Sequence, residues 1–169
     1  GYIRPEEFSK GNVLISGDFA LDLKSKVKLY GEILIDDFQP RYGLTSPLHW
    51  ASKWGILFGI QIVDILHLKN TDFRTEYSFL NQYVYTHAKP VNAYTHLDRP
   101  IGHHIGPDAQ SIWLQIKTQW VGNFVSELSF EHLQDGEQDI NIFQVPSDAN
   151  AKWEYLSGVE VIRRILQLS

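Results

Sequence analysis

The chain has 169 residues, the length of one domain or of part of one. It contains no cysteine, which excludes disulfide frameworks and thiolate metal sites, and its net charge of −5 with scattered Lys and Arg argues against a nucleic-acid-binding surface. No apolar run approaches the roughly 20 residues of a transmembrane helix, although a membrane β-barrel would leave the same weak signal because only alternate residues face lipid.

The first predicted element is a long β-hairpin. Over residues 12–23 the odd positions are mostly apolar and the even positions mostly polar, and the same alternation returns over residues 27–36 after a short polar turn. Period-two alternation predicts strands with one apolar face. Each arm is close to the about 9–11 residues that a tilted strand needs to cross a bilayer.

Further strands follow in the same manner. After a loop at residues 38–52, alternation predicts strands over 54–63, 72–79, 112–120 and 124–131, with a tight-turn signal at Gly122-Asn123 before the last of these. The segment at 54–63 is apolar on both faces, so we expect its inner side to meet a plug or a packed part of the interior.

The C-terminal part is less regular. A polar loop over residues 134–152 precedes a last predicted strand that begins near Trp153 and runs to the end. Residues 159–168 could also pass for an amphipathic helix, and we interpret them as a strand. The tryptophans fall near predicted strand ends, where interfacial aromatic girdles lie in membrane barrels: Trp50, Trp54, Trp113, Trp120 and Trp153.

These patterns predict an all-β fold, an antiparallel meander of about seven long strands that forms part of a transmembrane outer-membrane-type β-barrel. We expect one domain, or a partial barrel, over residues 1–169, with a long loop at 88–110. A soluble β-sandwich would show the same parity, but its strands are usually shorter. The charged residues of the strands all fall on the predicted polar face: Asp18, Asp22, Lys28, Glu32, Asp36, Asp72, Arg74, Glu76, Lys117, Glu127 and Glu131.

The segment Tyr94–Asp108 carries the most specific motif. It reads Y-T-H-L-D-R-P-I-G-H-H-I-G-P-D, and it resembles the pattern Y-x-H-x-x-x-P-L-G-H-x-x-G-P-(D/N) of the Wzi-like capsule assembly family, with Ile101 in the place of Leu. Arg74-x-Glu76-Tyr77 and Tyr85-x-His87 resemble the strand that precedes this motif. At motif level the resemblance covers residues 50–135.

The resemblance implies a β-barrel of the Gram-negative outer membrane, whose founding relative is a lectin that binds capsular polysaccharide. The partners it implies are surface or capsular polysaccharide and outer-membrane lipid. The chain looks too short for a whole barrel and lacks a terminal aromatic residue, so we expect it to be a fragment of one. The leading alternative is a soluble β-sandwich that binds carbohydrate or builds a surface structure.

Within the motif, Gly102 and Gly106 permit positive φ or close backbone approach, while prolines stiffen the turns. We expect this loop to fold back and constrict or seal the lumen. If a ligand site exists, we expect it where the loop meets the strand with Arg74 and Glu76. Arg suits acidic sugars if Arg74, Lys89, Arg99 and Lys117 concentrate positive charge there. The candidate ligand-binding residues are Arg74, Glu76, Tyr85, His87, Tyr94, His96, Arg99, His103 and Asp108, and Tyr83, Trp113, Asn92 and Asp98 supply similar groups.

We expect no enzyme activity and no cofactor. The sequence contains no Gly-x-Ser-x-Gly, P-loop or dinucleotide motif. Carboxylate pairs on one strand face are expected throughout a charged lumen and do not indicate a glycosidase. The histidines match no closed metal site in their spacing, so we expect them to hydrogen-bond loop carbonyls.

Overall fold

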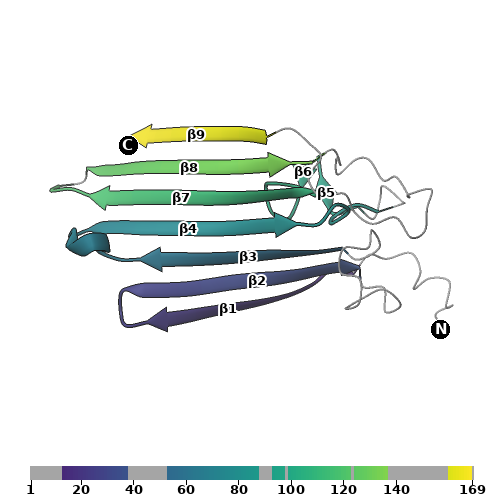
Figure 1. Ribbon diagram of the computed structural model, residues 1–169, viewed down its shortest axis with the longest axis horizontal. Coiled ribbons are helices and arrows are strands. Elements are labelled where there is room, and N and C mark those ends of the chain that lie inside the picture. The colour runs from purple at the N-terminus through teal and green to yellow at the C-terminus, as the bar shows by residue number, and fades with distance from the viewer. Residues whose placement is uncertain are drawn as a thin grey trace.

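The computed structural model describes residues 13–37, 53–87, 93–97, 99–122, 124–136 and 160–168. Seven strands form one antiparallel sheet in the order in which they occur along the chain, and Figure 1 shows them side by side. The strands of this sheet are β1 (Ile15–Leu23), β2 (Val27–Asp37), β3 (Lys53–Ile62), β4 (Thr71–Leu80), β7 (Ala109–Gln119), β8 (Val125–Asp135) and β9 (Glu160–Leu168).

Two small elements lie in the connections. A 3-10 turn, η1 (Ile65–His67), precedes β4, and a two-stranded ribbon of β5 (Thr95–His96) and β6 (Arg99–Pro100) lies between β4 and β7. The predicted all-β antiparallel meander is therefore confirmed. Its architecture is consistent with a segment of a barrel wall. In the described part of the chain, no helix is long and apolar enough to span a membrane.

The observed strand bounds differ from the predicted ones by one or two residues at most ends, and by more at the starts of β1 and β7 and at the end of β8, which runs to Asp135 rather than to residue 131. β7 begins at Ala109 rather than near Ile112, because its ladder with β4 continues up to the pair Leu80–Ala109. The segment that could have been a helix is the strand β9, which pairs with β8. The loop at 38–52, the start of the last predicted strand near Trp153, Asn92 and Asp98 all lie outside the described residues.

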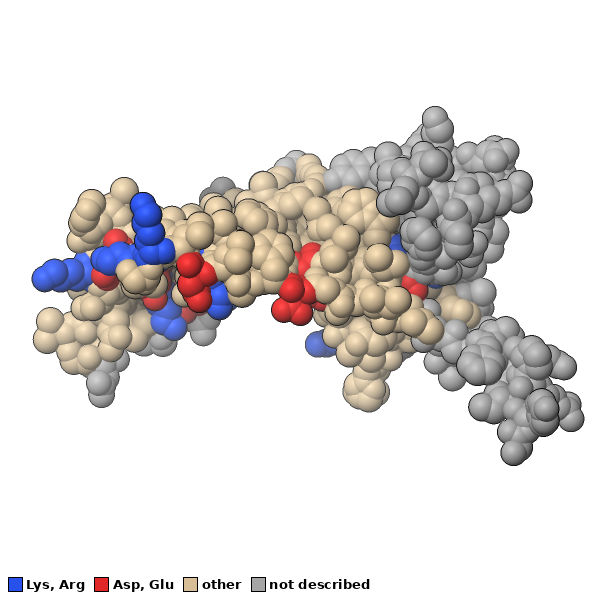
Figure 2. All heavy atoms as spheres, turned by 90° about the horizontal axis from the view of Figure 1, so that it is seen from below, with Lys and Arg blue, Asp and Glu red and all other residues tan. Residues whose placement is uncertain are grey.

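The cross-strand register confirms that the charged residues share one face. Asp18 lies opposite Glu32, Asp72 opposite Lys117, and Lys117 opposite Glu127. The other face is apolar and open, with Phe19 47% exposed and Leu128 51% exposed. Seen edge-on in Figure 2, Lys, Arg, Asp and Glu side chains gather along one side of the sheet, apart from those near its turn end. We call the charged side the inner face and the apolar side the outer face.

The buried core lies on the inner face, at the end of the sheet where β4 ends and β7 begins. Leu80, Val84, Tyr85, Ile105 and Leu133 are buried there, and Leu14 and Leu34 pack against them. In the described part of the chain, the core is thus built between the sheet and residues 81–87 and 99–108 of the connection between β4 and β7. Within the described residues, no second sheet covers the outer face, unlike the sandwich alternative, in which two sheets pack face to face.

Candidate functional site

The connection over residues 81–108 is fastened to the inner face by side chains from several strands. Lys53 on β3 donates from Nζ to the carbonyl of Thr86 at 2.8 Å, and Asp36 on β2 accepts the N–H of Tyr85 at 2.7 Å. Both charged side chains are buried. Because a buried charge costs free energy unless it is hydrogen-bonded, these contacts hold the connection in one place. The described residues of the connection therefore pack against the inner face, and the sealing of a lumen by the loop at 88–110 stays a prediction.

Tyr85 is the central residue of this connection. It is 3% exposed, its backbone has a left-handed φ of 69°, and burial raises the pKa of its hydroxyl. Its hydroxyl accepts the backbone N–H of His103 at 3.0 Å. A Cβ on Gly102 would come 2.3 Å from the Tyr85 ring. Gly102 is therefore required by close approach, whereas Gly106 has the positive φ of 75° that the motif predicts.

Two adjacent histidines fasten the second half of the connection. Nε2 of His103 lies 3.1 Å from the hydroxyl of Ser78 on β4, and Nε2 of His104 lies 2.8 Å from Glu131 on β8. The two rings are tilted by 34° relative to one another, with centroids 4.6 Å apart. Burial, together with the nearby His104, lowers the pKa of His103. These histidines bond strand side chains, which differs from the expected bonding to loop carbonyls.

Further along the inner face, four side chains form what we call the Tyr30–Arg74 cluster: Tyr30, Arg74, Glu76 and Trp113. Glu76 accepts hydrogen bonds from Tyr30 at 2.6 Å and from Arg74 at 2.5 Å, and Arg74 Nε donates to the Tyr30 hydroxyl at 2.7 Å. The Arg74 guanidinium lies 5.3 Å from the centre of the Tyr30 ring and 5.5 Å from that of Trp113. This arrangement presents aromatic surface and planar hydrogen-bonding groups together.

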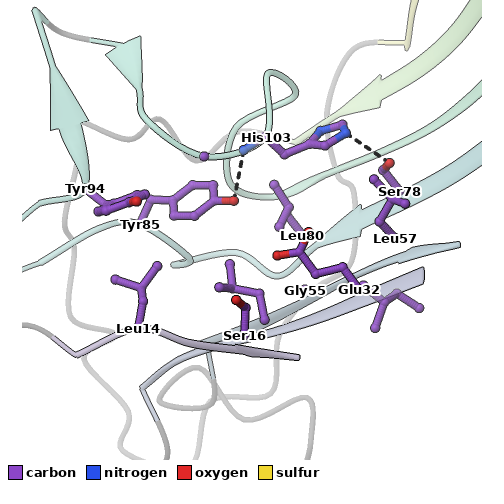
Figure 3. A pocket seen from close by; sticks show the side chains of 13 residues that line it. Leu14, Ser16, Glu32, Gly55, Leu57, Ser78, Leu80, Tyr85, Tyr94 and His103 are labelled. Atoms are coloured by element: carbon purple, nitrogen blue, oxygen red, sulfur yellow. Dashed lines mark hydrogen bonds between the residues drawn. The ribbon is translucent and has the colours of Figure 1, made fainter. Parts of the chain in front are cut away.

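Two of the cavities on the inner face are neighbours of the connection and of the Tyr30–Arg74 cluster. The first, of about 380 Å³, lies between the connection and strands β1–β4, and Figure 3 shows Tyr85, Tyr94 and His103 on one side of it with Leu14 and Ser16 on the other. The second, of about 400 Å³, lies beside the cluster and is lined by Lys28, Tyr30 and Arg74. Glu32 and Leu57 line both cavities, so the two are neighbours.

The structure brings five of the nine candidate site residues to these places. Arg74 and Glu76 are in the cluster, and Tyr85, Tyr94 and His103 line the first cavity. The remaining four lie outside both cavities. His96 and Arg99 are exposed partners in the β5–β6 ribbon, His87 is half-buried at the end of a described segment, and Asp108 is buried beside Gly136.

Sequence reasoning missed several residues of the site. Tyr30 was counted only within an alternating strand. Trp113 was named among the groups that supply the site, but it was expected near a strand end and instead lies within β7 beneath Arg74. Ser78 and Leu57 were not singled out. Alternation assigns each residue to a face, but the neighbours across that face depend on the register, which no local pattern states.

The local charge also differs from the expectation. Arg74 pairs with Glu76, and Lys117 lies 3.7 Å from Glu127, so neither cation leaves a net positive patch. Arg99 is on the ribbon, away from both cavities, and Lys89 lies outside the described residues. Of the residues described, no group of three His, Asp or Glu is placed to hold a metal ion.

The fold and the site define a class of protein. A single antiparallel meander of long strands, with an apolar outer face, a charged inner face and a long connection packed against the inner face, has the construction of an outer-membrane-type barrel wall. The sequence profile of the family described as Capsule assembly protein Wzi matches residues 9–161, and the chain belongs to this family. Comparisons with curated proteins and with solved structures give no match.

Proposed function

We propose that this chain is part of a Gram-negative outer-membrane β-barrel, and that its inner face binds or anchors surface polysaccharide without catalysing a reaction. Membership of the capsule assembly family supports the capsule-related role. The exposed apolar side chains of the outer face, such as Phe19, Phe58 and Ile112, support contact with lipid, because a soluble sheet would cover such a face.

The observation that carries the binding proposal is the Tyr30–Arg74 cluster. Sugars present apolar C–H faces that pack on aromatic rings and hydroxyl groups that bond planar side chains. The cluster offers both kinds of group on one surface, beside a cavity of about 400 Å³. Pockets of this size fall in the range that holds small ligands. In this proposal the bound segment of polysaccharide lies along the inner face, across β2, β3 and β4.

Binding of purified surface polysaccharide to the detergent-solubilised protein tests this proposal. Arg74→Ala removes both cation–π contacts and the bonds to Tyr30 and Glu76, so we expect at least about a tenfold loss of affinity, which corresponds to about 1.4 kcal/mol. The matched control is Lys26→Ala, which removes one positive charge and one exposed ion pair, to Asp64, at the turn end of the sheet.

Equal loss in both variants would mean that the polysaccharide senses only net charge, and equal retention would place the site elsewhere. Arg99→Ala is a second comparison, because Arg99 lies on the ribbon outside both cavities and we expect little effect. Each variant is first checked for folding by its heat-modifiable migration in gels, which the barrel assignment itself also predicts. Absence of heat-modifiable migration in the wild-type protein would favour the soluble β-sandwich instead.

A further inference from the structure

The first cavity has an apolar lining that the proposed polysaccharide site does not explain. It is lined by Leu14, which precedes β1, by Leu34, Leu57 and Leu80 on β2, β3 and β4, and by the ring of Tyr85 from the connection. Figure 3 shows Leu14 across the cavity from the loop aromatics Tyr85 and Tyr94. An apolar lining of this kind is not expected in a charged lumen. Because the connection covers these leucines, it encloses a small apolar space between itself and the sheet.

The first cavity has few polar groups, and the charged group among them is a carboxylate. Ser78 and His103 share their hydrogen bond at its edge, and Ser16 offers a hydroxyl. Glu32 supplies a carboxylate, and no Lys or Arg is among the described residues that line this cavity. The neighbouring cavity differs, because Lys28 and Arg74 line it. A ligand in the first cavity therefore meets hydrogen-bond acceptors and a negative charge, which disfavours an acidic group.

We propose that the first cavity is a subsite for one neutral sugar unit that carries a methyl group, either a 6-deoxysugar or an N-acetylated sugar. This inference deepens the proposed function and rests on it. The methyl group lies among the leucines, the sugar's C–H face packs on the ring of Tyr94, which is 37% exposed and lies beside the Tyr85 ring with centroids 5.7 Å apart, and a sugar hydroxyl donates to Glu32. A volume of about 380 Å³ is near the lower end for ligand pockets and fits a small ligand.

The position of the first cavity suits a sugar unit at the end of a polysaccharide chain or on one of its branches. It is closed on one side by the connection and adjoins the second cavity through Glu32 and Leu57. A saccharide chain can therefore place one unit under the connection and continue towards the Tyr30–Arg74 cluster. The two cavities select for different chemistry, because only the second is lined by cations.

Glycosides whose aglycone has no methyl group test the subsite directly. The protein, in a detergent without a sugar head group, is titrated by NMR with the 2-hydroxyethyl glycosides of N-acetylglucosamine, rhamnose, glucose and glucuronic acid. We expect at least one of the two methyl-bearing sugars to bind about tenfold more tightly than glucose, since one methyl group in an apolar pocket gives discrimination of this order. Glucuronic acid should bind most weakly.

Two substitutions on the same face of β1 distinguish the cavities. Ser16→Trp fills the first cavity and should abolish binding of the methyl-bearing glycoside, while Ala20→Trp projects into the second and should leave it unchanged. Both variants are checked for heat-modifiable migration. Equal affinities for all four glycosides, no binding of any glycoside at tens of millimolar, or equal effects of the two substitutions would overturn the subsite.

The outcome for the polysaccharide separates this inference from the proposed function. Polysaccharide binding that survives Ser16→Trp but is lost in Arg74→Ala would overturn the subsite and leave the proposed function intact. If the wild-type protein binds no polysaccharide, the proposed function fails, and the glycoside titration still decides the subsite by itself.

Discussion

The ring of Tyr30 lies directly over Gly59. A Cβ on Gly59 would come 2.1 Å from Cζ of this ring, a distance that real Cβ atoms do not adopt. Because β3 has no side chain at this position, Tyr30 crosses from β2 over β3, and its hydroxyl reaches Glu76 on β4 at 2.6 Å. The aromatic and charged groups of the proposed binding surface therefore depend on one glycine.

Gly59→Ala should displace Tyr30 and break its bonds to Glu76 and Arg74. We expect a loss of about 1–3 kcal/mol of stability from overpacking, together with a clear fall in polysaccharide affinity. The matched control is Gly17→Ala on the outer face, where an added Cβ would meet only Ile33, at 3.9 Å. Urea unfolding followed by heat-modifiable migration gives the stabilities. Equal behaviour of the two variants would contradict the role of Gly59.

Alanine substitutions of the two motif glycines, Gly102 and Gly106, should destabilise the protein for different reasons. Gly102→Ala puts a Cβ against the Tyr85 ring, while Gly106→Ala strains a backbone with φ of 75° and meets no atom within 4 Å. Each should destabilise the protein, the second by about 1 kcal/mol. In double-mutant cycles with Tyr85→Ala, Gly102→Ala should be strongly non-additive and Gly106→Ala nearly additive. Additivity in both cycles would show that the ring contact is not what requires Gly102.

The docking of the connection should weaken in acid. Burial holds the pKa of His103 below its ordinary value of 6.5 in the docked connection, and His104, Glu76 and Glu131 are the titratable groups that affect it. Once undocked, His103 regains the ordinary value, so below about pH 6.5 the undocked state binds more protons and is favoured. Above this pH, His103 should have no effect.

Hydrogen-exchange protection of the backbone amides of Tyr85 and His103 measures this docking, after correction for the intrinsic rates. Protection should be lower at pH 5.5 than at pH 7.5. His103→Gln keeps a group that can bond Ser78 but cannot titrate, so the pH dependence should shrink in that variant. Protection that rises on acidification, or an unchanged dependence in His103→Gln, would contradict the prediction.

The sequence determined which residues share a face but not which residues meet. Alternation placed Glu32, Arg74 and Glu76 correctly on one face, because period two in a strand depends only on the chain itself. The segment that forms β3 was predicted to be apolar on both faces. Its inner face has glycines at positions 55 and 59, and the side chains of Leu80 and Tyr30 from neighbouring strands occupy the space above Gly55 and Gly59.

The site was only partly predictable for the same physical reason. The loop motif pointed to Tyr85, Tyr94 and His103, which do line one cavity. Their partners Asp36 and Ser78 lie on other strands, and nothing in the local sequence links them. His96 and Arg99 belong to the same motif but are cross-strand partners in the β5–β6 ribbon.

A charge introduced on the outer face of β1 should impair membrane assembly, whereas a charge on its inner face should not. A charged residue on the lipid face of a barrel costs about 2–4 kcal/mol at the bilayer midplane. Phe19→Arg, on the outer face, should therefore cripple membrane assembly, while Asp18→Arg, on the inner face, should be tolerated. The fraction of heat-modifiable protein in isolated membranes measures this. Similar assembly of both variants would show that the two faces do not differ in environment.

The most direct test of a wet, ligand-binding inner face and a lipid-facing outer face uses two adjacent residues of β3. The chain has no cysteine, so Leu57→Cys and Phe58→Cys each provide a single thiol. Leu57 lines both inner cavities, and Phe58 is 43% exposed on the outer face. The measurement is the rate of labelling by a water-soluble maleimide in lipid bilayers, with and without surface polysaccharide. We predict that Leu57→Cys is labelled and that polysaccharide slows its labelling, while Phe58→Cys is protected in both conditions. Equal labelling of the two positions, or labelling of Leu57→Cys that polysaccharide does not change, would contradict this prediction.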